Sequence, residues 1–229
     1  ADCPDKRQVG VRLQAGANHI AVMVAQGGIS SFVRWGFWLR LADGDGRILN
    51  PAALHMPPAG EQQAVREALA VVNAQQLTNL VPNPTLSGVS TVEASSFGVW
   101  PPPMRERVSM DKSFAGIGKG AVKFTGVVGA SFNRFFKVKA GEKYLAGFTA
   151  YIHGSGVCYL HVGWRGKGVF LDNTLGNDFF PQGVESWQQI AGIITVPPEA
   201  DELTFSVSVS GQGVNESCYA TDLFLYKLP

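Results

Sequence analysis

The sequence has few charged residues: aspartate, glutamate, lysine and arginine make up 16% of its 229 residues, against about 25% in an ordinary soluble domain. The 19 basic and 18 acidic residues leave a net charge of +1, so the chain lacks the basic surface that is typical of nucleic-acid-binding proteins. No apolar run approaches the roughly 20 residues that a membrane-spanning helix needs. We therefore expect neither a nucleic acid nor a membrane among its partners.

The chain is also poor in cysteine, with Cys3, Cys158 and Cys218 as its three thiols and no CxxC pair. So few and so widely spaced cysteines exclude a disulfide framework as the basis of the fold. Cys158 and Cys218 both lie in segments with a strand-like pattern, where two buried thiols would act as small hydrophobic side chains. A disulfide between them is the alternative, and the sequence leaves it open.

Catalytic motifs are missing as well. The sequence has no GxSxG, HExxH or P-loop motif, and nothing in it singles out two carboxylates as a catalytic pair. Nothing resembles a signal peptide, and Ala1 could follow either a cleaved signal or a removed initiator methionine. We therefore expect a binding or structural protein that is not an enzyme.

Glycine, in contrast, is abundant at 27 residues, and short runs rich in phenylalanine, valine and threonine alternate with turn residues. That pattern predicts an all-β protein with many turns. Within the first 58 residues, "QVGVRLQ" and "HIAVMVA" place apolar residues at every second position, which is the period of half-buried strands. The run Asp43-Gly44-Asp45-Gly46 favours a hairpin turn. This part of the chain therefore predicts a small β-meander.

One segment has a helical period instead. "MPPAGEQQAVREALAVVNAQQL" places Val65, Leu69 and Val72 on one stripe and polar residues on the opposite side, as in an amphipathic helix. We expect this helix to cover the N-terminal sheet or to pack between domains. After Leu77 the helical period ends, and strand patterns follow to the C-terminus.

The stretch "NLVPNPTLSG", residues 79–88, joins the two parts. Its prolines suit an edge strand, where a missing N–H leaves no neighbour unsatisfied, so we interpret it as the first strand of a sandwich rather than as a linker. The sequence therefore predicts two domains: a β-meander with one helix at residues 1–77, and a β-sandwich at residues 78–229.

Four pieces of the second part occur in an order that one known family shares. They are "NLVPNPTL", "FFKVKAGEKYLAGFTAYIHG" with its V-x-x-G-x-x-Y turn, "SWQQIAGIITVPPEADELTFSVSV" and "YATDLFLYKLP". In these pieces, residues 79–229 resemble the jelly-roll carbohydrate-binding modules, including those attached to polysaccharide-degrading enzymes. The resemblance implies a C-terminal jelly-roll β-sandwich that binds glycans, although the matching residues chiefly concern the fold.

A sugar ring has C–H faces that pack on aromatic side chains and hydroxyls that need polar partners. Both chemistries occur in "VCYLHVGWRGKGVFLDN" and on the strand before it. The alternatives are a structural role for Trp164, a loop-anchoring role for Trp100, and a core or edge position for Trp187. The candidate carbohydrate-binding residues are Trp164, Tyr151, Tyr159, Arg165, Asp172 and Asn173.

The resemblance also implies a structural calcium ion, because modules of this family often hold one beside the first and last strands. Calcium takes oxygen ligands from carboxylates and carbonyls, and the positions to consider here are Glu93 and Asp222. The segment "VSTVEASS" departs from the acidic opening of the family. Beyond this calcium we expect no cofactor.

The organisation of the chain suggests a setting. A compact N-terminal part precedes the sandwich without a flexible Ser/Thr/Pro linker of the kind that usually joins modules to enzymes. This organisation looks like a bacteriophage virion protein, with residues 1–77 anchoring it to other virion proteins and the sandwich meeting surface polysaccharide. Phenylalanine and tryptophan in the N-terminal strands suggest an interface in a homo-oligomer. The alternative is a module of a secreted polysaccharide-degrading enzyme, and the sequence names no glycan.

Overall fold

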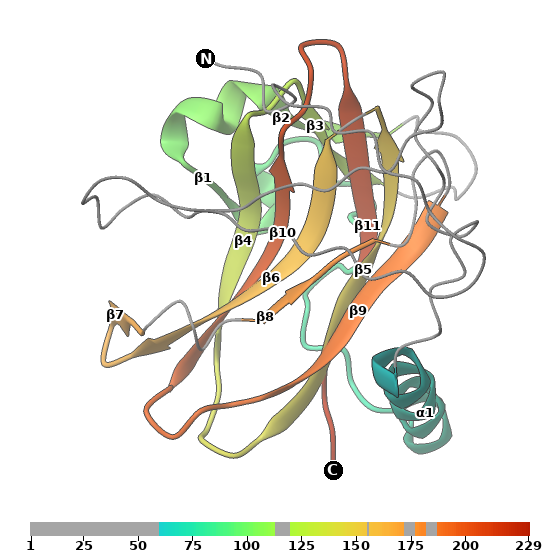
Figure 1. Ribbon diagram of the computed structural model, residues 1–229, viewed down its shortest axis with the longest axis vertical. Coiled ribbons are helices and arrows are strands. Elements are labelled where there is room, and N and C mark those ends of the chain that lie inside the picture. Colours follow the sequence, from blue (N-terminus) through green and yellow to red (C-terminus); the bar gives the residue numbers. More distant parts are fainter. Residues whose placement is uncertain (1–59, 113–119, 155, 172–176, 182–186) are drawn as a thin grey trace, which may run out of the picture. The chain divides into compact units, whose positions relative to one another are not determined.

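Figure 1 shows the computed structural model, which describes residues 60–112, 120–154, 156–171, 177–181 and 187–229. These residues form two antiparallel sheets that pack face to face. The predicted all-β jelly-roll sandwich is therefore confirmed. The predicted β-meander of residues 1–58 lies outside the described residues.

The first sheet has its strands in the order β1, β4, β10, β6 and β7, with β8 also paired to β6. The second sheet has the order β2, β3, β11, β5 and β9. Neighbours in both sheets are mostly distant in the sequence, as the wrapped topology of a jelly roll requires. The strands of the first sheet are β1 (Gly98–Trp100), β4 (Gly129–Lys137), β6 (Val157–Gly166), β7 (Val169–Phe170), β8 (Asn177–Phe179) and β10 (Glu202–Ser210). Those of the second are β2 (Val108–Asp111), β3 (Ala121–Thr125), β5 (Lys143–His153), β9 (Trp187–Thr195) and β11 (Ser217–Lys227).

The hydrophobic core lies between the sheets, because each long strand directs every second side chain inward. In β10, Leu203, Phe205 and Val207 are buried in this core. Aromatic contacts continue it toward β4 and the residues before β1, where the rings of Phe97 and Phe132 stack with centroids 4.5 Å apart. Two short 3-10 helices, η2 (Glu93–Ser95) and η3 (Pro102–Arg107), flank β1 in the sequence.

The segment at residues 79–86 enters the sandwich along β11, where β3 no longer pairs with that strand. The Leu80 N–H donates to the Leu225 carbonyl, and the Leu223 N–H donates to the Pro84 carbonyl, both at 2.9 Å. The Asn79 side chain adds two more bonds to β11, one from its amide to Leu223 O and one to its oxygen from the Leu225 N–H. The segment therefore follows β11, as its prediction as an edge strand implies, but it is irregular because its prolines lack N–H groups.

Helix α1 (Gly60–Gln75) packs on the outer side of the second sheet, beside β9 in Figure 1. Its stripe of Val65, Ala68 and Val72 forms a small core with Leu145 and Phe224. The predicted apolar stripe is confirmed, and its described partner is the sandwich. The predicted domain border at about residue 78 stays a prediction. No helix in the described part of the chain has the length and apolar character needed to cross a membrane.

Candidate functional site

A row of short hydroxyl side chains runs along the outer side of β10. Thr204, Ser206 and Ser208 alternate with the core residues of this strand, so they point away from the core. They are nevertheless buried, and Ser206 is 2% exposed. The neighbouring strands β4 and β6 flank them with larger side chains at most positions, but with Ser131 beside Ser208 and Gly163 beside Thr204. We call this surface the β10 face; it consists of Asn133, Phe135, Tyr159, His161, Arg165, Thr204, Ser206 and Ser208.

The register sets which side chains meet on this face. Thr204 lies opposite Phe135 on β4, while Ser206 lies opposite Asn133 on β4 and His161 on β6. Ser208 lies opposite Tyr159. The centre of the face therefore consists of short, neutral, polar side chains, and the longer side chains beside them are Phe135, Asn133, His161 and Tyr159.

The Thr204 hydroxyl is the most informative atom of this row. Its Oγ1 is buried and has no hydrogen-bond partner among the described residues. Buried polar atoms in folded proteins are nearly always paired, with protein or with bound water. Thr204 is the first residue of this outward-facing row, so we take its unpartnered hydroxyl as a candidate position for a hydrogen bond with another molecule.

Aromatic rings stand at one end of the face. Trp100 on β1 lies opposite Ser131 on β4 and is 65% exposed. On the other side of the same row, the rings of Tyr159 and the exposed Phe180 stack with centroids 5.2 Å apart. These rings offer flat apolar surfaces beside the hydroxyl row, which is the combination that a sugar ring requires.

An arginine between two phenylalanines stands at the other end. The Arg165 guanidinium lies 4.8 Å from the Phe135 ring centroid and 5.0 Å from that of Phe170. Its Nη1 donates to Glu202 Oε2 at 3.0 Å, and its Nη2 donates to the Gly168 carbonyl at 2.7 Å. Arg165 therefore holds the β6–β7 hairpin in place, and Glu202 balances its charge.

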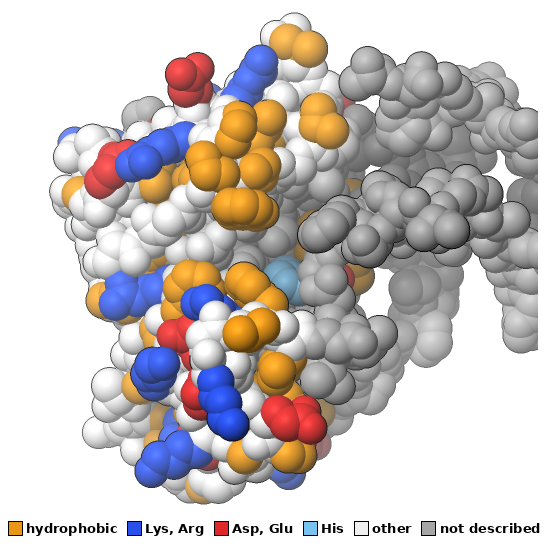
Figure 2. All heavy atoms as spheres, turned by 90° about the vertical axis from the view of Figure 1, so that its left-hand side faces the viewer, with side chains coloured by type: hydrophobic (Ala, Val, Ile, Leu, Met, Phe, Trp, Pro, Cys, Tyr) orange, Lys and Arg blue, Asp and Glu red, His pale blue; other side chains and the backbone are white. Residues whose placement is uncertain are grey.

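A histidine and an aspartate lie at the side of the face where β6 pairs with β8. His161 Nδ1 lies 2.6 Å from Asp178 Oδ1, and the two residues are directly opposite in the pairing of β6 with β8. Figure 2 shows the neighbouring edge of the sandwich, where hydrophobic side chains gather in two groups with polar and backbone atoms between them. The exposed large hydrophobic residues on the strands of the first sheet are Trp100 on β1, Phe135 on β4, and Val169 and Phe170 on β7.

The structure separates the residues that the sequence suggested for a sugar site. Tyr159 and Arg165 lie together on the β10 face. Tyr151 lies on the outer side of the other sheet, where its ring is 5.7 Å from that of Trp187. Asp172 and Asn173 lie outside the described residues.

Trp164 requires a correction. It is 2% exposed and belongs to the core between the sheets. Along β6 it shares its orientation with the buried Leu160 and Val162, whereas Tyr159 and Arg165 point outward. A sugar cannot stack on its indole without opening the core, so the expected exposed platform is not Trp164, and the structural alternative accounts for this residue.

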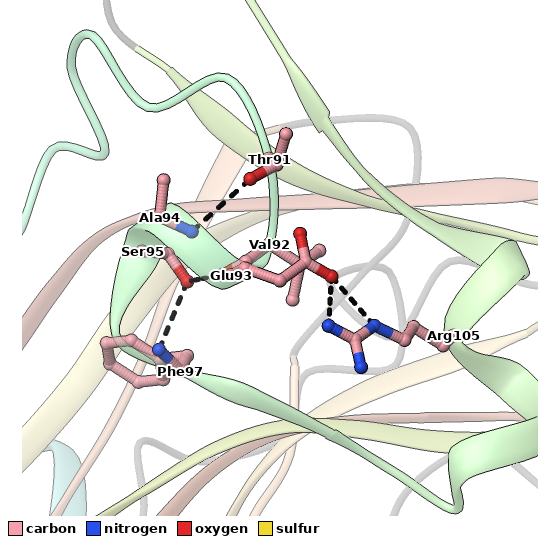
Figure 3. Close-up of polar contacts among 7 residues, drawn as sticks. All are labelled: Thr91, Val92, Glu93, Ala94, Ser95, Phe97 and Arg105. Atoms are coloured by element: carbon pink, nitrogen blue, oxygen red, sulfur yellow. Dashed lines mark hydrogen bonds and ion pairs between the residues drawn. The ribbon is translucent and has the colours of Figure 1, made fainter.

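The two positions considered for calcium have other surroundings. The Glu93 carboxylate accepts hydrogen bonds from Nε and Nη2 of Arg105 (Figure 3). Hydrogen bonds from its own backbone N–H and from Arg105 lower the pKa of Glu93. Asp222 lies at an irregularity of β11 with a positive φ of 49°. The described residues contain no group of three or more His, Cys, Asp or Glu that could hold a metal ion.

The same close-up shows why Glu93 lies where it does. The Thr91 hydroxyl accepts from the Ala94 N–H, and the Ser95 hydroxyl donates to the Val92 carbonyl while accepting from the Phe97 N–H (Figure 3). These bonds form the short helix η2 and leave its glutamate pointing toward Arg105 on η3. This arrangement connects the two 3-10 helices that flank β1.

Sequence reasoning missed several residues of the face. Trp100 was interpreted as a loop anchor, and Thr204, Ser206 and Ser208 were not considered for a site. The signal for these three was present in "ELTFSVSVS", because its strict alternation of hydroxyl and apolar residues predicts one polar side of a strand. Phe180 and Asn133 carried no comparable signal.

The comparisons with known proteins concern the fold. No protein-family model matches the sequence, and no curated protein matches it. Solved structures do resemble it, at low identity. The enzymatically active domain of tailspike protein 4 from bacteriophage CBA120 matches with a TM-score of 0.51 and 13% identity, over 66% of this chain and 21% of that chain.

Carbohydrate-binding modules are also among the similar structures. The module TmCBM61, solved with β-1,4-galactotriose, has a TM-score of 0.48 and 18% identity, over 66% of this chain and 99% of its own. A family 16 carbohydrate-binding module has a TM-score of 0.47 and 17% identity, over 64% of this chain and 99% of its own. The tailspike match shows a shared fold, and it spans about a fifth of the tailspike chain.

Proposed function

We propose that this chain is a non-catalytic protein that binds a polysaccharide on its β10 face. The observation that carries the proposal is the row of buried hydroxyls on β10, with the unpartnered Thr204 Oγ1 in it and exposed aromatic rings at its ends. Hydroxyls on the face would exchange hydrogen bonds with sugar hydroxyls, and the rings would pack on the C–H faces of the sugar.

The charges of the face favour a neutral glycan. Arg165 and Lys137 both pair with Glu202, and His161 pairs with Asp178. Between these pairs the row consists of neutral hydroxyls. A strongly acidic polysaccharide would have to compete with Glu202 for Arg165, so uronic-acid-rich chains are the less favoured ligands.

The test is a glycan array followed by calorimetry on the full chain and on two variants. Thr204→Val keeps the side-chain shape and removes the hydroxyl, so we expect affinity to fall about fivefold, the effect of one ordinary hydrogen bond of about 1 kcal/mol. Trp100→Ala removes an exposed ring, and we expect a loss of about tenfold.

The matched control for these variants is Val214→Ala, because Val214 is 76% exposed and lies on none of the strands that form the face. This variant is expected to bind like the unaltered chain. Absence of binding to every glycan on the array would contradict the proposed function. Equal affinities for all variants would show that the chain binds a glycan at a place other than the β10 face.

For the biological setting, we favour a phage virion component that displays the sandwich for host-surface polysaccharide. The support is the compact organisation of the sequence, with residues 1–77 as the proposed anchor to other virion proteins. The fold shared with part of a phage tailspike agrees with this setting. Many weak sites on one particle would gain avidity, so a shallow face would suffice.

The alternative setting is a carbohydrate-binding module of a secreted polysaccharide-degrading enzyme. The resemblance of residues 79–229 to such modules supports it. The neighbouring genes distinguish the two settings: tail or capsid genes beside this one are expected for the virion protein, and hydrolase genes would contradict the virion setting.

The structural calcium ion that the resemblance implies at Glu93 and Asp222 is tested by measuring the change in the thermal midpoint on adding a chelator.

A further inference from the structure

Two cysteines from different sheets face each other inside the sandwich. Cys158 is the second residue of β6, and Cys218 is the second residue of β11. Both are 0% exposed and belong to the core between the sheets. They lie at the same end of the molecule, because Cys218 pairs with Ile152 on β5, and the turn after β5 leads directly to Cys158.

Both thiols are free in this structure, and they lie close enough for the Cys158 thiol to influence the titration of Cys218. Burial raises the pKa of the Cys218 thiol, and the neighbouring Cys158 thiol raises it further. A catalytic or metal-binding thiol needs a lowered pKa, because the thiolate is the reactive species. The surroundings of Cys218 therefore argue against nucleophilic chemistry at this thiol in the folded state. The placement of the two thiols, buried between the sheets on strands of different sheets, suits cross-linking instead.

We propose that Cys158 and Cys218 form a disulfide that joins the two sheets when the chain folds in the presence of a small-molecule disulfide such as oxidised glutathione. One cysteine thiolate attacks a glutathione sulfur and releases one glutathione thiol. The second cysteine then attacks the mixed disulfide and releases the other. In sum, the protein loses two protons and two electrons, and the glutathione disulfide is reduced to two thiols.

The reaction belongs to folding rather than to the finished fold. At 0% exposure neither sulfur of the folded protein can be reached by glutathione, whereas both are accessible in the unfolded chain. Once formed, the bond closes the loop of residues 158–218. A loop of this length restricts the unfolded chain strongly, and we expect the thermal midpoint to rise by about 10 °C.

The test compares the full chain refolded in a glutathione redox buffer with the same chain refolded in excess dithiothreitol. Both samples are alkylated in guanidinium, digested without reduction and analysed by mass spectrometry. The oxidised sample is expected to contain a cross-linked peptide pair with Cys158 and Cys218, lighter than the two free peptides by two hydrogens, with Cys3 alkylated. The oxidised sample is also expected to unfold about 10 °C higher.

Three variants control the assignment. Cys3→Ser is expected to keep both the cross-link and the midpoint difference, while Cys158→Ala and Cys218→Ala are expected to lose both. If an alanine variant fails to fold, the mass measurement on the unaltered chain still decides. Complete alkylation of all three cysteines after oxidative refolding would overturn the proposal, as would a cross-link that contains Cys3.

Discussion

Glu142 connects the turn between β4 and β5 to the last strand of the sandwich. Its Oε2 accepts from the Tyr144 hydroxyl at 2.6 Å and from the Lys139 N–H at 2.9 Å, and its Oε1 accepts from Lys227 Nζ at 2.6 Å. The hydrogen bond from Lys227, followed by that from Tyr144, lowers the pKa of Glu142 to about 2. This geometry explains the V-x-x-G-x-x-Y turn, because Gly141 with its φ of 80° allows the reversal and Tyr144 reaches back to Glu142.

The lowered pKa leads to a prediction about pH. A carboxyl with a folded pKa of about 2 against an ordinary 4.5 stabilises the fold fully above pH 4.5, and this contribution is lost as pH falls toward 2. Glu142→Gln is therefore expected to lower the urea midpoint slightly at pH 7 and by progressively less below pH 4.5. Glu199→Gln is the control, because Glu199 is exposed. A pH-independent difference for Glu142→Gln would contradict the role of its charge.

The orientation of single residues on β6 was partly predictable from the sequence. Tyr159 and Arg165 lie an even number of positions apart, so the period of a strand places them on one side, and it places Trp164 on the other. Which side faces water does not follow from β6 alone, because either could have been the core. The structure buries the Trp164 side, and the sugar-stacking role expected of that residue was wrong for this reason.

The strands of the second sheet are packed closely enough that one glycine is required. A Cβ added to Gly147 on β5 would lie 2.4 Å from Phe224 Cζ and 2.6 Å from the Ile190 carbonyl oxygen. Phe224 itself belongs to the small core beneath helix α1. The glycine therefore lets Phe224 of β11 and the backbone of β9 approach β5.

We expect Gly147→Ala to reduce the free energy of unfolding by about 1–3 kcal/mol, as overpacking of a core does. Gly129→Ala on β4 is the matched control, because a Cβ there meets no atom within 4 Å. Urea unfolding followed by tryptophan fluorescence measures both. A Gly147→Ala protein as stable as Gly129→Ala would show that the contact of β11 with β5 can relax.

At the scale of the whole molecule, the packing of helix α1 bears on where the C-terminal domain begins. Its Val65, Ala68 and Val72 cover Leu145 and Phe224 of the second sheet. Residues 60–229 should therefore fold as a sandwich with its helix, whereas residues 78–229 would expose that apolar surface to water. The two fragments differ by residues 60–77, which lie before the predicted border at residue 78.

We expect the 78–229 fragment to be less stable than the 60–229 fragment by about 3 kcal/mol, from the apolar surface that loses its cover. Denaturant unfolding of both fragments measures the difference, with the full chain as the reference. Glycan binding is expected in both, because the β10 face lies on the other sheet. Equal stability would support the border at residue 78 and give the helix no role in holding the sandwich.

The sequence by itself determined the strands, the all-β class and the sides of each strand, because the period of two is a local property of the chain. It also placed Tyr159 and Arg165 on one side of one strand. Only the tertiary structure decided which sides meet in the core and which residues of distant strands become neighbours. Thr204 meets Phe135 through a pairing of β10 with β4, while Tyr151 lies on the other sheet. Such pairings join segments far apart in the sequence, and their register is set by the packing of all the strands together.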